Sequence, residues 1–188
     1  MRHGETEWSL TGQHSGRVDL PLTPNGEREA LETARALAGA KFDLVLCSPL
    51  RRSVRTCELC GLLPQARLEP DVMEWDYGDF NGLTRQQIRR TRPGWNIWDG
   101  PVPGGESIDQ VAARAQRVLA SAAACGHVAI FAHGHFLRVL VTQFLALDPR
   151  HGRCFALSTG SVSILGDDQG FPAILAWNRK GGSANLLS

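Results

Sequence analysis

The chain has 188 residues, of which 43% are hydrophobic and 21% charged, as in an ordinary soluble globular domain with its own core. Its formal net charge of +1 excludes a strong overall field, so we expect neither nucleic acid nor a membrane surface as a partner. The sequence has no apolar run near the ~20 residues of a membrane span and no signal-peptide pattern. We therefore expect a single domain over residues 1–188, located in the cytoplasm.

The first half of the chain predicts a helix, a strand and a second helix. Residues 23–40 (TPNGEREALETARALAGA) offer Thr23 as N-cap and Pro24 at the first helical position, followed by Ala and Leu at helical spacing. The short apolar run FDLVLC at 42–47 is typical of a strand covered on both faces. Residues 48–62 (SPLRRSVRTCELCGL) then have a helical pattern.

The second half repeats this alternation after a long loop. The predicted elements are a Pro-, Gly- and Trp-rich loop at 92–107, a helix capped by Ser107, a strand at 127–132 (HVAIFA), a helix through FLRVLVTQFLAL at 136–147, and a hairpin of strands 161–166 and 173–177. Alternating strands and helices predict an α/β fold, a three-layer α/β/α sandwich with a mostly parallel central sheet.

The five cysteines are an odd number, and two of them are three residues apart in TCELC. That spacing is compatible with a zinc or redox site. No second close pair completes a zinc site, and a redox pair would begin a helix, whereas Cys57 and Cys60 lie several turns into one. We therefore expect buried free thiols.

Three polar motifs lie where predicted elements meet. RHGE opens the chain, CSPLRRS follows the first predicted strand and AHGHFLR follows the second. In open α/β sheets, ligands bind beyond the carboxyl ends of strands, where helices present free N–H groups. If RHGE also follows a strand, four cationic or protonatable side chains meet in one crevice: Arg2, His3, Arg52 and His133. Such a group needs an anion between its members, and phosphate suits the paired N–H donors of arginine.

These motifs resemble those of the histidine phosphatase superfamily, the phosphoglycerate mutase-like proteins. The resemblance rests on RHGETEW, SGRVDLPLTPNGEREA, SPLRRSVRT, EWDYGDFNGLT, PGGES and AHGH, which occur in the family's order over nearly the whole chain. The most similar subgroup includes bacterial acid phosphatases often labelled phosphoglycerate mutases, and related sugar-bisphosphate phosphatases. The chain has Ser9 where many members have Asn, and Ser15 where many have Thr, and both changes keep a hydrogen-bonding group.

The resemblance implies that the chain hydrolyses phosphomonoesters of small metabolites such as sugar phosphates or phosphoglycerate. His3 would attack phosphorus and become a phosphohistidine. Nearby arginines would lower the pKa of its imidazole and keep it neutral. Glu74 would protonate the leaving alkoxide and later deprotonate the attacking water, and a phosphate dianion beside it would raise its pKa.

The remaining site residues follow from the same resemblance. Phosphate oxygens would be bound by Arg2, Arg52 and His133, and the substrate pocket would be lined by Ser9, His14, Ser15, Gly16 and His135. The guanidinium groups supply the positive charge, so we expect no metal and no cofactor. Trp75, Trp95 and Trp98 either cover the pocket or pack the long loop.

Three alternatives remain open at this stage. A metallophosphoesterase would use His3, His133 and His135 as ligands, but the two arginines would repel its cation. A mutase would return the phosphoryl group to the substrate, and the resemblance implies a long insertion in such enzymes that is absent here. A phosphate-binding module would not be an enzyme.

The motif RHGE has only Met1 before it. In the resembling family, four to seven apolar residues form an interior strand that leads to the arginine and histidine. Without that strand, two neighbouring strands keep unpaired backbone groups, each costing roughly 1–3 kcal/mol when buried. We therefore expect that the chain is short at its N-terminus. Alternatively, the sheet closes without the strand or borrows one from a partner. The stretch FPAILAW at 171–177 is a candidate surface for a homodimer.

Overall fold

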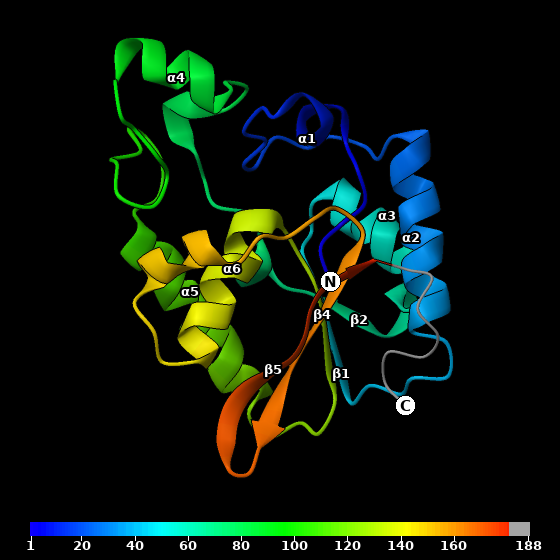
Figure 1. The fold of residues 1–188 in the computed structure, drawn as a ribbon. Coiled ribbons are helices and arrows are strands. Elements are labelled where there is room, and N and C mark those ends of the chain that lie inside the picture. The colour runs from blue at the N-terminus through cyan, green and yellow to red at the C-terminus, as the bar shows by residue number, and fades with distance from the viewer. Residues whose placement is uncertain (181–188) are drawn as a thin grey trace.

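The computed structural model describes residues 1–180 (Figure 1). Its central strand β1 (Leu44–Cys47) is parallel to both neighbours, β2 (Ala66–Leu68) and β3 (Val128–Phe131). An antiparallel hairpin, β4 (Ser161–Asp168) and β5 (Phe171–Lys180), completes the strands. The strands at 42–47, 127–132 and in the hairpin were expected from the sequence, whereas β2 was not.

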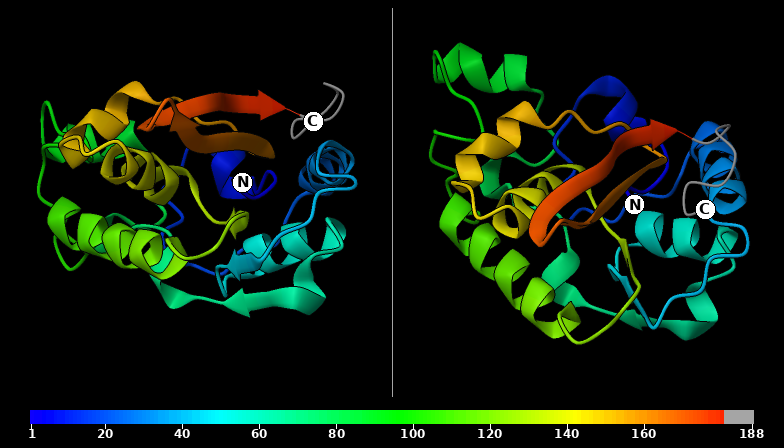
Figure 2. Two further views of the ribbon diagram at one scale, coloured as in Figure 1. Left: turned by 90° about the horizontal axis from the view of Figure 1, so that it is seen from below. Right: turned by 60° about the horizontal axis from the view of Figure 1, so that its bottom comes forward.

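Helices cover both faces of the strands. They are α1 (Glu7–Thr11), α2 (Pro24–Ala36), α3 (Arg51–Leu59), α4 (Arg85–Thr91), α5 (Ile108–Ala122) and α6 (Gly134–Phe144). Short 3₁₀ helices occupy Leu63–Gln65, Pro70–Val72, Gly78–Phe80 and Pro149–Cys154. Helices α2 and α3 lie on one side and α5 and α6 on the other, with the strands between them (Figure 2). This confirms the predicted three-layer α/β/α fold with a mostly parallel central sheet. None of these helices is both long and apolar enough to span a membrane.

The helices begin where side-chain caps were predicted. Thr23 precedes Pro24, and its hydroxyl accepts from the N–H of Gly26. Ser107 and Gln110 form a reciprocal capping box before α5. Each cap satisfies backbone N–H groups that have no partner within the helix, which explains why these two boundaries were legible in the sequence.

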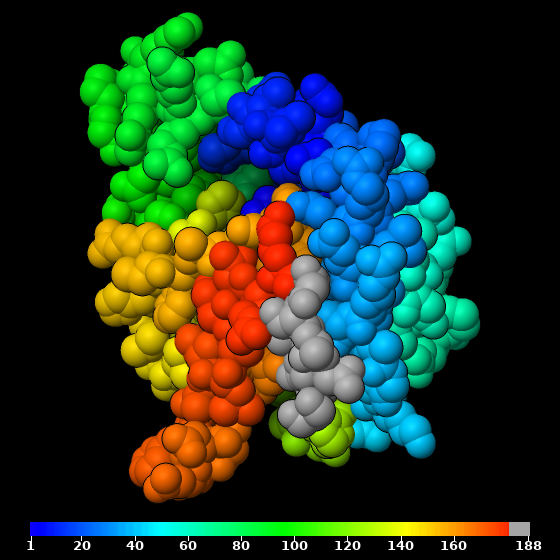
Figure 3. Space-filling view, turned by 45° about the vertical axis from the view of Figure 1, so that its right-hand side comes forward, coloured from blue at the N-terminus to red at the C-terminus, as the bar shows by residue number. Residues whose placement is uncertain are grey.

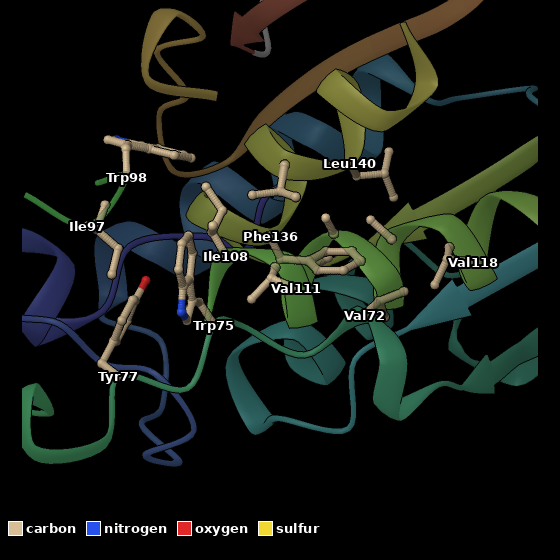
Figure 4. Close-up of a cluster of buried hydrophobic side chains, with 14 of the residues drawn as sticks. Val72, Trp75, Tyr77, Ile97, Trp98, Ile108, Val111, Val118, Phe136 and Leu140 are labelled. Atoms are coloured by element: carbon tan, nitrogen blue, oxygen red, sulfur yellow. The ribbon is translucent and has the colours of Figure 1, made fainter. Parts of the chain in front are cut away.

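The largest core cluster lies between α5, α6 and the long loop (Figure 4). Val111 of α5 and Phe136 of α6 are fully buried in it. Trp75, Trp95 and Trp98 are also buried there. The indole N–H of Trp75 donates to the carbonyl of Glu106, and that of Trp95 to the carbonyl of Pro101. The three tryptophans therefore pack the long loop onto the core.

Residues 1–3 join the parallel strands to the hairpin. Arg2 forms a parallel bridge with Ala132, and its N–H donates to the carbonyl of Ser161 on the hairpin. The carbonyl of Met1 accepts from the N–H of Ala132. A cavity of about 600 Å³ lies beside Met1, lined by β3 and β4. Residues before Met1 are not tested by this structure, and the expectation about them stays a prediction.

The hairpin projects beyond the body of the molecule (Figure 3). Phe171 and Leu175 of β5 are 72% and 57% exposed. These exposed apolar side chains lie in the stretch expected to form a homodimer surface, and the homodimer stays a prediction.

The cysteines are all free, and their burial differs. Cys57 lies on the inner face of α3 and is buried, as is Cys47. Cys60 and Cys125 are partly buried, and Cys154 is exposed. The expectation of buried free thiols for the TCELC pair is therefore confirmed for Cys57, whereas Cys60 is only partly buried.

The segment that carries His3 runs directly against the start of α2. The N–H of Thr23 donates to the carbonyl of Glu5. A Cβ atom added to Gly4 would lie 2.2 Å from the carbonyl oxygen of Gly26, and one added to Gly26 would lie 2.1 Å from that of Glu5. Two glycines therefore permit a backbone-to-backbone contact that no other residue allows.

We expect Gly26→Ala to destabilise the protein by about 3 kcal/mol, because two backbones must separate to admit the methyl group. The matched control is Gly39→Ala, where φ is +82° but the space is open. Its cost should be only about 1–2 kcal/mol, from the left-handed backbone alone. Urea unfolding of both variants measures the difference. Equal losses would contradict the close packing at Gly26.

Candidate active site

The carboxyl ends of β1 and β3 bring the polar motifs together. Ser48 follows β1, and α3 begins at Arg51. His133 is the N-cap of α6, two residues after β3 ends. Since residues 1–3 run alongside Ala132, the RHGE motif reaches the same edge of the sheet. The predicted convergence of Arg2, His3, Arg52 and His133 therefore occurs in the structure.

The imidazole of His3 is buried and its two nitrogens have different partners. Its Nδ1 lies 2.7 Å from the carbonyl oxygen of Gly4, which can only accept, so Nδ1 carries the hydrogen. Its Nε2 accepts from the Nε–H of Arg52 at 3.2 Å. Burial, together with Arg52 and Arg2, holds the pKa of His3 well below its usual 6.5. The result is a neutral imidazole whose lone pair on Nε2 faces the site.

The two arginines bring positive charge to this histidine, and Arg52 is fully buried whereas Arg2 is partly buried. Arg52 is 1% exposed, and its remaining N–H groups donate to the carbonyls of Val18 and Gly16 at 2.8 and 2.7 Å. Arg2 donates to the carbonyl of Leu157. Burial lowers the pKa of both guanidinium groups, and within residues 1–180 neither forms a salt bridge. An anion placed here would balance them.

His133 completes the group of four. It is fully buried, and its ring centroid lies 5.1 Å from that of His3. Its Nε2 lies 2.7 Å from the hydroxyl oxygen of Ser48. Its Nδ1 and the Nε of Arg2 are two of the three buried side-chain polar atoms without a hydrogen-bond partner in residues 1–180. Buried polar atoms are rarely left unpaired, so these two indicate a ligand position.

Glu74 lies at the N-terminus of α6, next to His133. Its carboxylate accepts from the backbone N–H groups of Trp75, His135 and Phe136 at 3.0, 3.1 and 2.9 Å. The side chain is 7% exposed. These contacts fix the carboxyl group at the start of α6, beside the group of four.

Two further histidines extend the site beyond Glu74. His135 is hydrogen-bonded through Nδ1 to the hydroxyl of Tyr77, and the ring of His14 lies 4.8 Å from that of Tyr77. Burial and then Arg85 lower the pKa of His14 to about 4. Burial and then Arg138 hold the pKa of His135 well below 6.5. Both predicted residues therefore lie near the site as neutral rings.

The other three residues predicted to line the substrate pocket, Ser9, Ser15 and Gly16, differ in what their atoms contact. The side chain of Ser9 forms a capping box with Thr6 at the start of α1, so its hydroxyl is already engaged. Ser15 is partly buried, and its hydroxyl makes no hydrogen bond within residues 1–180. Gly16 has φ +48° and contributes its carbonyl to Arg52. Gly16 thus belongs to the site through its backbone.

Sequence reasoning missed several contributors. Ser48 lies within CSPLRRS and Tyr77 within EWDYG, so the motifs contained them, but neither was assigned a role. The carbonyls of Val18 and Leu157, which bind the arginines, left no signal in the sequence because every residue has one.

Comparison with known proteins matches residues 1–180 to the histidine phosphatase superfamily (branch 1). The chain is 38% identical over 175 residues to an acid phosphatase of Mycobacterium tuberculosis, covering 90% of this chain and 86% of that protein. It is 35% identical over 181 residues to a 2,3-bisphosphoglycerate-dependent phosphoglycerate mutase of Bradyrhizobium diazoefficiens, covering 85% and 86%. It is also similar to the solved structure of an M. tuberculosis open reading frame, with TM-score 0.90, 36% identity and coverage of 96% and 95%.

The chain therefore belongs to the histidine phosphatase superfamily, as its motifs indicated. The names of these relatives include both acid phosphatase and phosphoglycerate mutase, the two kinds of protein that the motifs resembled.

We expect acid to destabilise the protein through its neutral histidines. The four with lowered pKa are His3, His14, His133 and His135. Below pH 6.5 the unfolded chain binds protons at these positions and the folded chain does not. The free energy of unfolding therefore falls as pH drops, by up to about 1.4 kcal/mol per pH unit for each group, and these groups have no effect above pH 6.5.

Thermal unfolding between pH 7 and 4.5 checks this expectation. His14→Gln should make Tm less sensitive to acid, because it removes one group that titrates between 6.5 and about 4. His151→Gln, at an exposed position, is the control and should leave the slope unchanged. A Tm that does not fall on acidification would contradict the neutral histidines.

Proposed function

We propose that this chain is a phosphomonoester hydrolase that acts through a phosphohistidine at His3. The observation that carries the proposal is the lone pair of His3 Nε2 beside the guanidinium groups of Arg52 and Arg2, with the Nε of Arg2 and the Nδ1 of His133 unpaired. A neutral nucleophile within a ring of positive charge suits attack on a phosphate dianion. Membership of the superfamily and the similarity to an acid phosphatase support the same reaction.

In the first step, the Nε2 lone pair forms a bond to phosphorus and the bond from phosphorus to the leaving oxygen breaks. The proton of a protonated Glu74 carboxyl moves to the departing alkoxide. Arg2, Arg52 and the Nδ1 side of His133 bind the non-bridging oxygens as their charge redistributes. The Nε–H that Arg52 gives to His3 becomes available to a phosphate oxygen.

In the second step, water attacks the phosphohistidine. Glu74 takes a proton from this water, the P–N bond breaks, and its electron pair returns to Nε2. Inorganic phosphate leaves, and the enzyme regains neutral His3 and protonated Glu74. Each proton and electron pair is accounted for by chain residues and water, so the proposal needs no metal and no cofactor.

Transfer to a second hydroxyl of the substrate is the other candidate, because one relative is named a mutase. The long insertion expected in mutases does not distinguish transfer from hydrolysis here. The match covers 86% of the relative named a mutase, so little of that relative lies outside the match. Hydrolysis is favoured by the similarity to the acid phosphatase, which has the higher identity of the two. The substrate class is a small phosphorylated metabolite, and the cytoplasmic location stays a prediction.

Replacing His3 by Ala should lower kcat by about 10³-fold or more, because it removes the nucleophile that forms the covalent intermediate. It should also abolish an acid-labile, base-stable phosphoenzyme, trapped by quenching with a labelled phosphomonoester. His151→Ala is the matched control and should keep both signals. EDTA should leave the wild-type rate unchanged. Substantial turnover by His3→Ala, or EDTA inhibition that a metal reverses, would overturn the mechanism.

Glu74→Gln should affect substrates according to their leaving group. Loss of the acid should lower kcat/KM by about 10²-fold or more for a sugar phosphate, and far less for p-nitrophenyl phosphate, whose leaving group hardly needs a proton. Glu58→Gln, at an exposed carboxylate, is the control. Equal losses on both substrates would show that Glu74 only supports the site.

A further inference from the structure

The contact between Ser48 and His133 sets which nitrogen of His133 faces the phosphate. We propose that Ser48 is a positioning residue that holds the neutral His133 ring in its Nδ1–H form. This inference rests on the proposed function, because it assigns the ligand of Nδ1 as a phosphate oxygen. Ser48 itself does not touch the substrate in this assignment.

Ser48 is held at the junction of two strands. It follows β1 directly, is fully buried, and its backbone N–H donates to the carbonyl of Phe131 at the end of β3. Its hydroxyl oxygen lies 2.7 Å from Nε2 of His133. The hydrogen bond between them can run in either direction, and the direction fixes the tautomer.

The other contact of the hydroxyl decides the direction. The N–H of Leu50 lies 3.4 Å from the Ser48 oxygen and can only donate to it. The hydroxyl hydrogen then needs an acceptor, because burial excludes water. Within residues 1–180, the Nε2 of His133 is the one acceptor within hydrogen-bond distance of this hydroxyl. Ser48 therefore donates, Nε2 carries the lone pair, and the hydrogen of the neutral ring is on Nδ1.

In this tautomer the unpaired Nδ1 of His133 can donate a hydrogen bond to a phosphate oxygen. Nδ1 is then a donor, like the other unpaired nitrogen at the site, Nε of Arg2. Two buried donors without an acceptor fit the oxygens of a phosphate. The opposite tautomer would turn a lone pair of Nδ1 toward the anion and repel it. Removing the Ser48 hydroxyl should therefore weaken phosphate binding although the protein–phosphate contacts themselves are untouched.

The test combines a spectroscopic measurement with a binding measurement. In wild-type protein, ¹⁵N chemical shifts of the His133 ring should show a protonated Nδ1 and an unprotonated Nε2 at pH 7. In Ser48→Ala, the two nitrogens should show a mixture of tautomers or the reverse assignment. The inhibition constants of orthophosphate and vanadate should rise about tenfold or more. Ser48→Thr, which keeps the hydroxyl, should restore both signals.

Ser53→Ala is the matched control. Ser53 is equally buried, and its hydroxyl also contacts the end of β3, donating to the carbonyl of Phe131 at 2.9 Å. Within residues 1–180 its hydroxyl forms no hydrogen bond with His133, so its loss should leave the tautomer unchanged and the inhibition constants within about twofold of wild type.

The wild-type ¹⁵N measurement decides the proposal even if Ser48→Ala fails to fold. A protonated Nε2 in wild type would overturn it, as would a Ser48→Ala protein with unchanged tautomer and unchanged phosphate affinity. Failure of the proposed function looks different. In that case wild-type protein would show the expected tautomer, but neither orthophosphate nor vanadate would bind and no phosphomonoester would be hydrolysed.

Discussion

Two guanidinium groups, that of Arg52 fully buried and that of Arg2 partly buried, lie beside one neutral imidazole, and this is the constraint that organises the molecule. Charge of one sign is costly to bury without a partner, and within residues 1–180 no carboxylate forms a salt bridge with Arg2 or Arg52. Backbone carbonyls solvate them instead, and these come from segments far apart in the sequence, at Gly16, Val18 and Leu157. The loops around the site are therefore held in place by the same charges that would bind the substrate.

The neutral histidines follow from the same constraint. Positive charge nearby, added to burial, disfavours a proton on His3 and on His133. Glu74 lies beside these groups, and its position is fixed by the backbone N–H groups that begin α6. The start of α6 thus positions two site residues. His133 is its N-cap, and Glu74 accepts hydrogen bonds from its first free N–H groups.

Sequence reasoning predicted what strong patterns specify. Apolar runs predicted strands β1 and β3, and N-cap residues predicted the starts of α2 and α5. The motifs at strand ends predicted that the four site residues converge. The three-residue strand β2 was missed because its residues are mostly exposed and include Arg67, so no apolar period marks it. The sequence did not reveal that the Ser9 side chain pairs with Thr6. That capping box depends on how the chain turns after the first motif. The role of Ser48 needed the distance to His133, a residue 85 positions away.

The bridge that residues 1–3 make between Ala132 and Ser161 has a consequence for how the protein loses activity. Residues 1–3, which include His3, form the connection between the parallel strands and the hairpin, and we call this segment the seam. Local opening at this seam would displace His3 while the helices and the parallel strands stay folded. Proteins open in such cooperative units with free energies below that of global unfolding. Loss of activity and amide exchange in residues 1–3 would then begin together, because one local opening causes both. The highest temperature at which the enzyme is active would depend on a few backbone hydrogen bonds, and it can lie below the melting temperature of the whole domain.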